Sequence, residues 1–189
     1  MSRRVLATGM MLLGLAACQP SDPDISADAD SGPADLESFP AFWSTDVSTS
    51  MMTDQKDVLM STMGLPVGGL SSQPIALFVV RCHEGGLNVY VSSREFMSSR
   101  AIAVQFRFDE KPAEAADLRV TSDQRGFGWW GEAEALPIVR EVQQAERLLV
   151  RYTPYGENVR EVQFKLAGFG DEFPELAAAC NVPVAPDRT

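Results

Sequence analysis

Apolar and polar side chains alternate with a period of two over much of this sequence, and this alternation limits the possible folds more than any other feature. It is clearest in residues 101–109 (AIAVQFRFD) and 160–166 (REVQFKL), and it recurs in 86–92 and 146–153. Successive side chains of a β-strand point to opposite faces, so each of these segments is expected to be a strand with one buried face. Residues 75–82 (IALFVVRC) are mostly apolar on both faces, as in a central strand covered on both sides.

Turn and helix signals lie between these strands. Residues 42–50 and 56–63 are expected to form a hairpin, with its turn at 52–55. A helix is expected at 137–145, because Pro137 suits the first turn of a helix and apolar residues follow it on one side.

A second helix is expected near the end of the chain. Asp171 can cap a helix that begins at Glu172, and the apolar residues that follow are spaced to form one stripe. The members of the stripe are Phe173, Leu176, Ala177 and Cys180. The predicted fold is therefore α+β but mostly β: an antiparallel sandwich or open barrel-like sheet, with one or two short helices including a C-terminal one.

The N-terminal residues have the layout of a secretory signal. Two arginines precede an uncharged apolar segment, 5–17, that is shorter than the ~20 residues needed to span a bilayer. Residues 15–18 (LAAC) resemble a bacterial lipobox, which predicts a signal peptide at 1–17 and acyl chains on Cys18. The alternatives are a transmembrane anchor and an ordinary signal peptide beside an incidental cysteine.

The residues that follow suggest a destination and a division of the mature chain. Cys18 is followed by Gln19 rather than Asp, which by the sorting rule for bacterial lipoproteins favours the outer membrane, with the protein facing the periplasm. Residues 18–38 have too few large apolar side chains to fold, so they are expected to be a disordered acidic tether. The globular domain is expected at 39–182, with a short tail at 183–189.

The charge of the chain excludes one class of partner. The sequence has 16 Lys and Arg against 26 Asp and Glu, a net charge of −10 at pH 7. Nucleic acids are bound through clustered basic side chains, so nucleic acid is not expected as a partner. Contact with the membrane is expected only through the acyl chains on Cys18, because anionic headgroups repel an acidic domain.

The two remaining cysteines, Cys82 and Cys180, are expected to form a disulfide. Secretion would expose them to an oxidising compartment, where thiols pair. Cys82 ends the most apolar predicted strand, and Cys180 lies on the apolar stripe of the last predicted helix. A disulfide would fix this helix to the sheet. The alternative is two buried free thiols.

Candidate catalytic and metal-binding residues are weak. His83, the only histidine, follows Cys82 in a predicted strand, so the two side chains point to opposite faces and a surface imidazole is expected. Glu132 and Glu134 precede the predicted helix, where the helix dipole favours acidic side chains without any catalytic role. The acidic residues of 22–30 lack the fixed Gly and the final Glu of a calcium loop. No catalytic residue, metal or cofactor is expected.

Two adjacent tryptophans, Trp129 and Trp130, stand in the glycine-flanked segment 127–131 (FGWWG). Two adjacent Trp in such a segment can place one ring in the core and the other outside, where an exposed Trp could anchor a partner. The alternative is that both rings pack over the edge of the sheet.

Several short motifs follow one another between Trp43 and Cys180. They are Trp43 with 48–58 (STSMMTDQKDV), 77–82 (LFVVRC), Tyr90 with Phe96, 104–109 (VQFRFD), Ser122-Asp123, 149–157 (LVRYTPYGE), 162–168 (VQFKLAG), and Leu176 with Ala179-Cys180. In order and spacing they resemble the type VI secretion-associated VasI/TagO-like family of small envelope proteins. The two cysteines of the resemblance are the pair expected above, and no catalytic residue is carried over.

The resemblance implies a lipid-anchored, non-enzymatic accessory or binding component of the cell envelope, connected with type VI secretion. Such a component would meet a protein partner through its surface. The residues expected to contact the partner are Trp129, Trp130, Arg107 and Tyr155. One alternative is a periplasmic binder or inhibitor of a cell-wall or envelope hydrolase, because an acidic surface suits basic lysozyme-like enzymes. A hydrolase with unrecognised residues is another.

Overall fold

The computed structural model describes residues 40–68, 73, 75–97 and 100–183. The predicted signal peptide at 1–17, the lipid on Cys18 and the tether at 18–38 lie outside the described residues, as does all but one residue of the tail predicted at 183–189.

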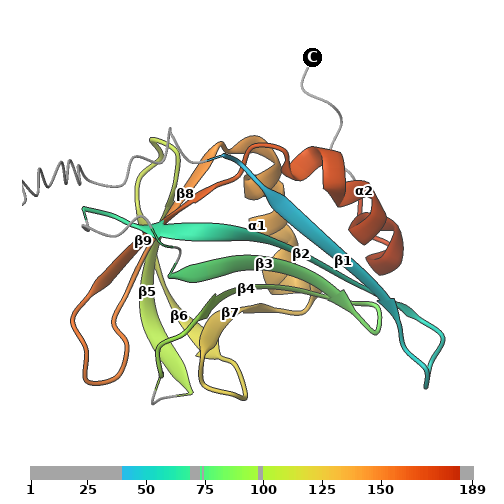
Figure 1. The fold of residues 1–189 in the computed structure, drawn as a ribbon, viewed down its shortest axis with the longest axis horizontal. Coiled ribbons are helices and arrows are strands. Elements are labelled where there is room, and N and C mark those ends of the chain that lie inside the picture. The colour runs from blue at the N-terminus through green and yellow to red at the C-terminus, as the bar shows by residue number, and fades with distance from the viewer. Residues whose placement is uncertain (1–39, 69–72, 74, 98–99, 184–189) are drawn as a thin grey trace, which may run out of the picture. The chain divides into compact units, whose positions relative to one another are not determined.

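The described residues form nine strands and two helices (Figure 1). Their bounds are β1 Trp43–Thr49, β2 Lys56–Pro66, β3 Ala76–His83, β4 Gly86–Ser93, β5 Ala101–Phe108, β6 Glu114–Val120, β7 Gly126–Trp130, α1 Glu132–Gln144, β8 Arg147–Tyr152, β9 Arg160–Lys165 and α2 Phe169–Cys180. Neighbouring strands are antiparallel, in the order β1-β2-β3-β4-β7-β6-β5-β8-β9. β2 also pairs with β9, so the sheet from β2 to β9 closes into a barrel and β1 extends it beside β2.

This architecture confirms the predicted fold class, a mostly β, antiparallel, barrel-like sheet with two helices that include a C-terminal one. The alternation of apolar and polar residues in the sequence correctly predicted which face of each strand is buried. In β5, the side chains of Val104, Phe106 and Phe108 are buried, whereas their neighbours are exposed or half-buried. In β9, Val162 and Phe164 are buried in the same way.

Helix α1 begins at Glu132, five residues before the predicted start. Gly131 has a φ of 80°, a left-handed conformation that glycine adopts freely, and it lets the chain turn from β7 directly into the helix. Pro137 therefore lies inside the helix instead of opening it. The proline removes one backbone N–H donor, and the helix continues around it because its apolar face packs into the core.

Helix α2 begins at Phe169, three residues before the predicted Glu172, and Gly168 rather than Asp171 stands at its N-cap. Tertiary packing moves the start, because the ring of Phe169 is buried between those of Trp43 and Phe173, with centroid distances of 4.9 and 5.0 Å. The predicted stripe is correct, since all four of its residues are buried.

Two strands were not predicted. β6 (EAADLRV) has a short apolar alternation at Ala116, Leu118 and Val120, which was not recognised because only Leu118 is a large, fully buried side chain, and pairing with β5 holds the strand in the sheet. β7 (GFGWW) contains two glycines and is only five residues long. Both strands depend on their neighbours, and the chain between 114 and 130 gives little local signal for them.

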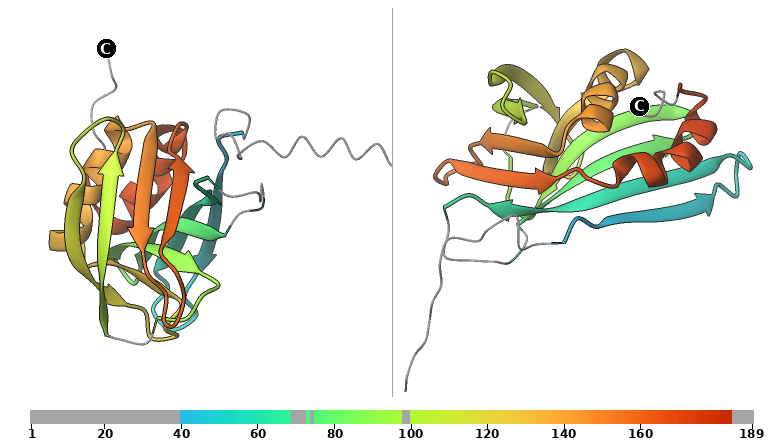
Figure 2. Two further views of the ribbon diagram at one scale, coloured as in Figure 1. Left: turned by 90° about the vertical axis from the view of Figure 1, so that its left-hand side faces the viewer. Right: turned by 90° about the horizontal axis from the view of Figure 1, so that it is seen from above.

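Helix α2 is fixed to the sheet by packing and by a covalent bond. It contacts β1, β2 and β3 (Figure 2). Cys82 of β3 and Cys180 of α2 form a disulfide, with their Cα atoms 5.6 Å apart. The predicted pair is therefore confirmed. The indole N–H of Trp43 also donates to the carbonyl of Leu166, 3.2 Å away, just before the helix.

The antiparallel order places functional candidates at one end of the barrel. The connections β4–β5, β6–β7 and β8–β9 all emerge at the same end, because each follows a strand that runs in the same direction. The hairpin turns β1–β2 and β3–β4 lie at the opposite end.

Neither helix of the described residues has the length and apolar character that crossing a bilayer requires.

Candidate functional site

The first candidate surface is the loop end of the barrel. It consists of residues 94–97, 100, 121–125 and 153–159. Backbone hydrogen bonds join its three connections: the N–H of Met97 donates to the carbonyl of Gln124 at 2.8 Å, and the N–H of Tyr155 donates to the carbonyl of Phe96 at 2.9 Å. The three connections are therefore one hydrogen-bonded surface rather than independent loops.

A polar cluster of two buried side chains, Ser93 and Tyr152, and two half-buried ones, Glu95 and Arg160, lies beneath the loop end. The hydroxyl of Tyr152 donates to Glu95 Oε2 at 3.2 Å and lies 3.2 Å from Ser93 Oγ. Arg160 Nε donates to Glu95 Oε1 at 2.6 Å. Burial raises the pKa of Tyr152 to about 12, so its hydroxyl stays protonated and remains a donor. The cluster joins the ends of β4, β8 and β9 beneath the loops.

Apolar side chains stand exposed above this cluster. Phe96 is 46% exposed, Tyr155 is 67% exposed and Val159 is 56% exposed. The rings of Phe96 and Tyr155 meet edge to face, with centroids 6.2 Å apart and an interplanar angle of 81°. An aromatic pair that is fixed by the backbone is already ordered for contact with a partner, and aromatic side chains are enriched among interface anchors.

The loop end also carries arginines in a chain that is acidic overall. Arg94, Arg100 and Arg125 form no ion pair with a carboxylate of the described residues. Arg125 Nη1 instead donates to the carbonyl of Arg94, 2.7 Å away. These guanidinium groups keep donors available for a partner's carboxylates.

The second candidate surface is a groove on the outer face of β4 and β7, with a volume of about 440 Å³. It is lined by Arg81, His83, Asn88, Tyr90, Ser92, Thr121, Ser122, Asp123, Arg125, Gly126 and Trp130. No aliphatic side chain is among them. Two other cavities, of about 440 and 350 Å³, are lined partly by aliphatic side chains such as Val159 and Leu77.

Stacked aromatic rings form the floor of the groove. Tyr90 of β4 and Trp130 of β7 have centroids 5.5 Å apart and an interplanar angle of 18°. The indole N–H of Trp130 donates to the carbonyl of Arg119 at 3.2 Å, which fixes the ring at one edge. Gly128 is the β7 residue opposite Tyr90, and a Cβ atom there would lie 2.5 Å from the Cβ of Tyr90. Glycine therefore lets the two strands approach beneath the rings.

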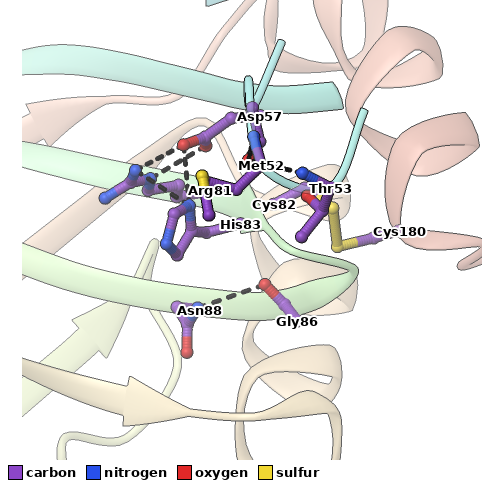
Figure 3. Close-up of polar contacts among 10 residues, drawn as sticks. Met52, Thr53, Asp57, Arg81, Cys82, His83, Gly86, Asn88 and Cys180 are labelled. Carbon is purple, nitrogen blue, oxygen red and sulfur yellow. Dashed lines mark hydrogen bonds and ion pairs between the residues drawn. A yellow bond between two sulfur atoms is a disulfide. The ribbon is translucent and has the colours of Figure 1, made fainter. Parts of the chain in front are cut away.

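One wall of the groove is a charged cluster from β2 and β3 (Figure 3). Asp57 accepts two hydrogen bonds from Arg81, from Nε at 3.0 Å and from Nη2 at 2.5 Å. His83 Nδ1 lies 2.7 Å from Asp57 Oδ2. The hydrogen bond from Arg81 is the main cause that lowers the pKa of Asp57, so this group remains a carboxylate at neutral pH.

The opposite wall is the β6–β7 turn. Asp123 Oδ1 accepts from the hydroxyl of Thr121 at 2.5 Å and from the backbone N–H of Arg125 at 3.1 Å. The hydrogen bond from Thr121 is the largest cause that lowers the pKa of Asp123. Burial is the main cause that raises the pKa of Tyr90. The positive charge of Arg81 lowers this pKa, and the negative charge of Asp123 raises it. The walls therefore combine fixed cations with fixed anions.

The four residues predicted to contact a partner are not brought together. Trp129 is 8% exposed and packs in the core against Phe106, at 5.3 Å between centroids, so it offers no contact surface in this fold. Trp130 lies in the groove and Tyr155 at the loop end. Arg107 lies on β5, away from both, and faces Glu110 at 3.7 Å.

Other residues that the sequence singled out have structural surroundings. His83 is exposed beside Asp57, while its neighbour Cys82 is buried in the disulfide, so the two do point to opposite faces. Glu134 lies in the first turn of α1 and accepts the N–H of Trp130 at 3.0 Å. No group of three or more His, Cys, Asp or Glu within the described residues is arranged to hold a metal ion.

Two parts of the site escaped sequence reasoning. The Asp57–Arg81 pair depends on the register between β2 and β3, which the sequence does not reveal. The pairing of Tyr90 with Trp130 depends on β7, which was not predicted as a strand. Phe96 and Tyr90 were noted only as hydrophobic positions of the resemblance.

Comparisons with known proteins add little to this description. The sequence matches no known protein family and no curated protein. Among solved structures, the chain is similar to the crystal structure of invasion associated protein B from Bartonella henselae. The identity is 14%, the match covers 73% of this chain and 92% of that one, and the TM-score is 0.49. A similarity this distant carries no argument about function.

Proposed function

We propose that the protein is a lipid-anchored, non-enzymatic component of the bacterial cell envelope that binds a protein partner, connected with type VI secretion. The lipobox ending at Cys18 supports an anchor, with Gln19 favouring the periplasmic side of the outer membrane. The disulfide between Cys82 and Cys180 supports an oxidising compartment, because such bonds persist there. The VasI/TagO-like motifs support the link with secretion.

The observation that carries the proposal is the exposed aromatic pair at the loop end. Phe96 and Tyr155 are fixed by a backbone hydrogen bond and stand among three arginines without ion pairs to described carboxylates. Aromatic and arginine side chains together are typical of interface anchors. The partner that fits is an envelope protein with an apolar pocket surrounded by carboxylates.

The test is complementation of a strain that lacks this protein and has an active type VI system. The Phe96→Ala/Tyr155→Ala variant is expected to abolish restoration of secretion, measured as release of the secreted tube protein. Arg107→Ala, on β5, is the matched control and is expected to restore secretion fully. Both variants should reach normal levels in the envelope, because the substituted side chains are exposed or half-buried.

Two outcomes would contradict the proposal. Full restoration by the double variant would show that the loop end is not the recognition surface. Normal secretion in the deletion strain, together with inhibition of a basic muramidase by the purified protein, would favour the hydrolase-inhibitor alternative.

A further inference from the structure

We propose that the groove on the outer face of β4 and β7 binds a neutral saccharide. The groove shares Thr121, Ser122, Asp123 and Arg125 with the loop end, but it does not include the Phe96–Tyr155 pair on which the proposed function depends. It rests on three properties of the groove: a lining without aliphatic side chains, an ordered aromatic floor, and charged walls whose charges cancel.

The lining excludes apolar ligands. The groove has a volume of about 440 Å³, within the range of small-molecule sites, roughly 300–1,000 Å³. Eight of its eleven residues have polar or charged side chains, two are aromatic and one is glycine. An acyl chain or another aliphatic ligand would displace water from these polar side chains and would offer them no hydrogen bonds in return, which is unfavourable.

Tyr90 and Trp130 cover one face of each other by stacking, and the inference is that a ring face left uncovered by this contact receives the apolar face of a sugar ring. Aromatic faces carry partial negative charge, and the C–H groups on one face of a pyranose are weakly positive, so the two attract. Trp130 is held by its indole N–H to Arg119 and by its stacking on Tyr90. Because the rings are ordered before any ligand arrives, binding costs little side-chain entropy.

The walls favour a neutral ligand over an ion. Arg81 and Arg125 contribute two positive charges, and Asp123 with Asp57 behind Arg81 contributes two negative charges. Asp57 and Asp123 both have lowered pKa values, so the balance persists at neutral pH. An anion or a cation would meet like charge within the groove. A hydroxyl group both donates and accepts, so it can bond to the guanidinium groups and to the carboxylates.

The same walls favour several hydroxyl groups in one ligand. Donors and acceptors are present on both sides of the groove, in the Arg81 cluster on one side and in Thr121, Ser122 and Asp123 on the other. Polyhydroxylated rings carry groups of both kinds in fixed directions. Among common biological ligands, saccharides match this pattern together with aromatic rings in the lining.

The experiment uses the full chain with its disulfide intact. Calorimetric titration and tryptophan fluorescence would be measured with the β-1,4-linked N-acetylglucosamine tetramer and with maltotetraose. At least one of these saccharides is expected to bind with an affinity that is insensitive to added salt, because a neutral ligand makes no screened ion pair. Trp130→Ala is expected to weaken binding at least about tenfold.

Two further variants keep the test decisive if Trp130→Ala does not fold. Ser122→Trp places a bulky ring at the wall without touching the core, and it is expected to abolish binding while the thermal midpoint is unchanged. Arg151→Ala on β8 is the matched control, because it lines another cavity, and its affinity is expected to equal that of the wild type. If neither saccharide binds, or if Ser122→Trp leaves the binding intact, the inference is overturned.

Discussion

The disulfide gives the sharpest prediction about stability. In the Cys82→Ala/Cys180→Ala variant, the bond that fixes α2 to β3 is lost. The closed loop spans 98 residues, and the chain-entropy relation gives about 4.7 kcal/mol for a loop of that length. Measured values for disulfides are typically about 2–4 kcal/mol, so we expect a loss of about 3 kcal/mol in the free energy of unfolding.

The loss can be measured by urea denaturation and by thermal melting. With an m-value of about 2 kcal/mol/M, the midpoint is expected to fall by roughly 1.5 M urea. The melting temperature is expected to fall by roughly 6–12 °C. Amide exchange in α2 should accelerate more than exchange in β5, because α2 loses its covalent link to the sheet.

Two controls separate the bond from other effects of the substitutions. Wild-type protein in reductant should match the double variant, whereas Cys18→Ser, which leaves the pair intact, should match the oxidised wild type. An unchanged midpoint in the double variant, or two reactive thiols per chain when Cys18→Ser is denatured without reductant, would refute the reasoning.

Three further predictions concern single residues. Gly128→Ala is expected to cost about 2 kcal/mol or more in urea denaturation, because its Cβ would lie 2.2 Å from a carbonyl of β4, whereas Gly170→Ala, with open space around its Cβ, is the mild control. Asp57→Asn is expected to lose the stabilisation by Arg81. Because the folded pKa of Asp57 is lowered from 3.8, the difference from wild type should be complete above about pH 5 and should shrink as the pH falls through 3.8 toward the lowered folded pKa. A difference that persists unchanged to lower pH would contradict this. The raised pKa of Tyr152 predicts that stability falls as pH rises from 10 toward about 12, and that Tyr152→Phe loses this component of the fall.

The strands with local alternation could be predicted, whereas those stabilised by neighbours could not. β5 and β9 show alternation in their own sequences, so their buried faces follow from the period of two. β6 alternates only over Ala116, Leu118 and Val120, one of them fully buried, so its local signal is weak and pairing with β5 stabilises it as a strand. The start of α2 similarly depends on the contact between Phe169 and Trp43, which lie far apart in the sequence.

The candidate surfaces show the same division. Tyr155 and Trp130 were recognisable as residues able to anchor a partner, because large aromatic side chains stand beside glycines in turn-like segments. Their surroundings were not predictable. The Phe96–Tyr155 pair joins two connections. The floor of the groove joins β4 and β7, whose paired residues Asn88 and Trp130 are 42 positions apart in the sequence. Register and loop contacts are set by the closed sheet as a whole.

Site-specific photocrosslinking in cells tests the central claim most directly. A photoreactive residue at Val159, on the loop end, is expected to give one discrete adduct with an envelope protein. The same probe at Met52, in the exposed β1–β2 turn at the opposite end of the barrel, is expected to give none. The adduct partner should also bind the purified protein, with a dissociation constant raised at least about 30-fold by Phe96→Ala/Tyr155→Ala. Equal crosslinking from both positions, or affinity that the double variant leaves unchanged, would contradict the account.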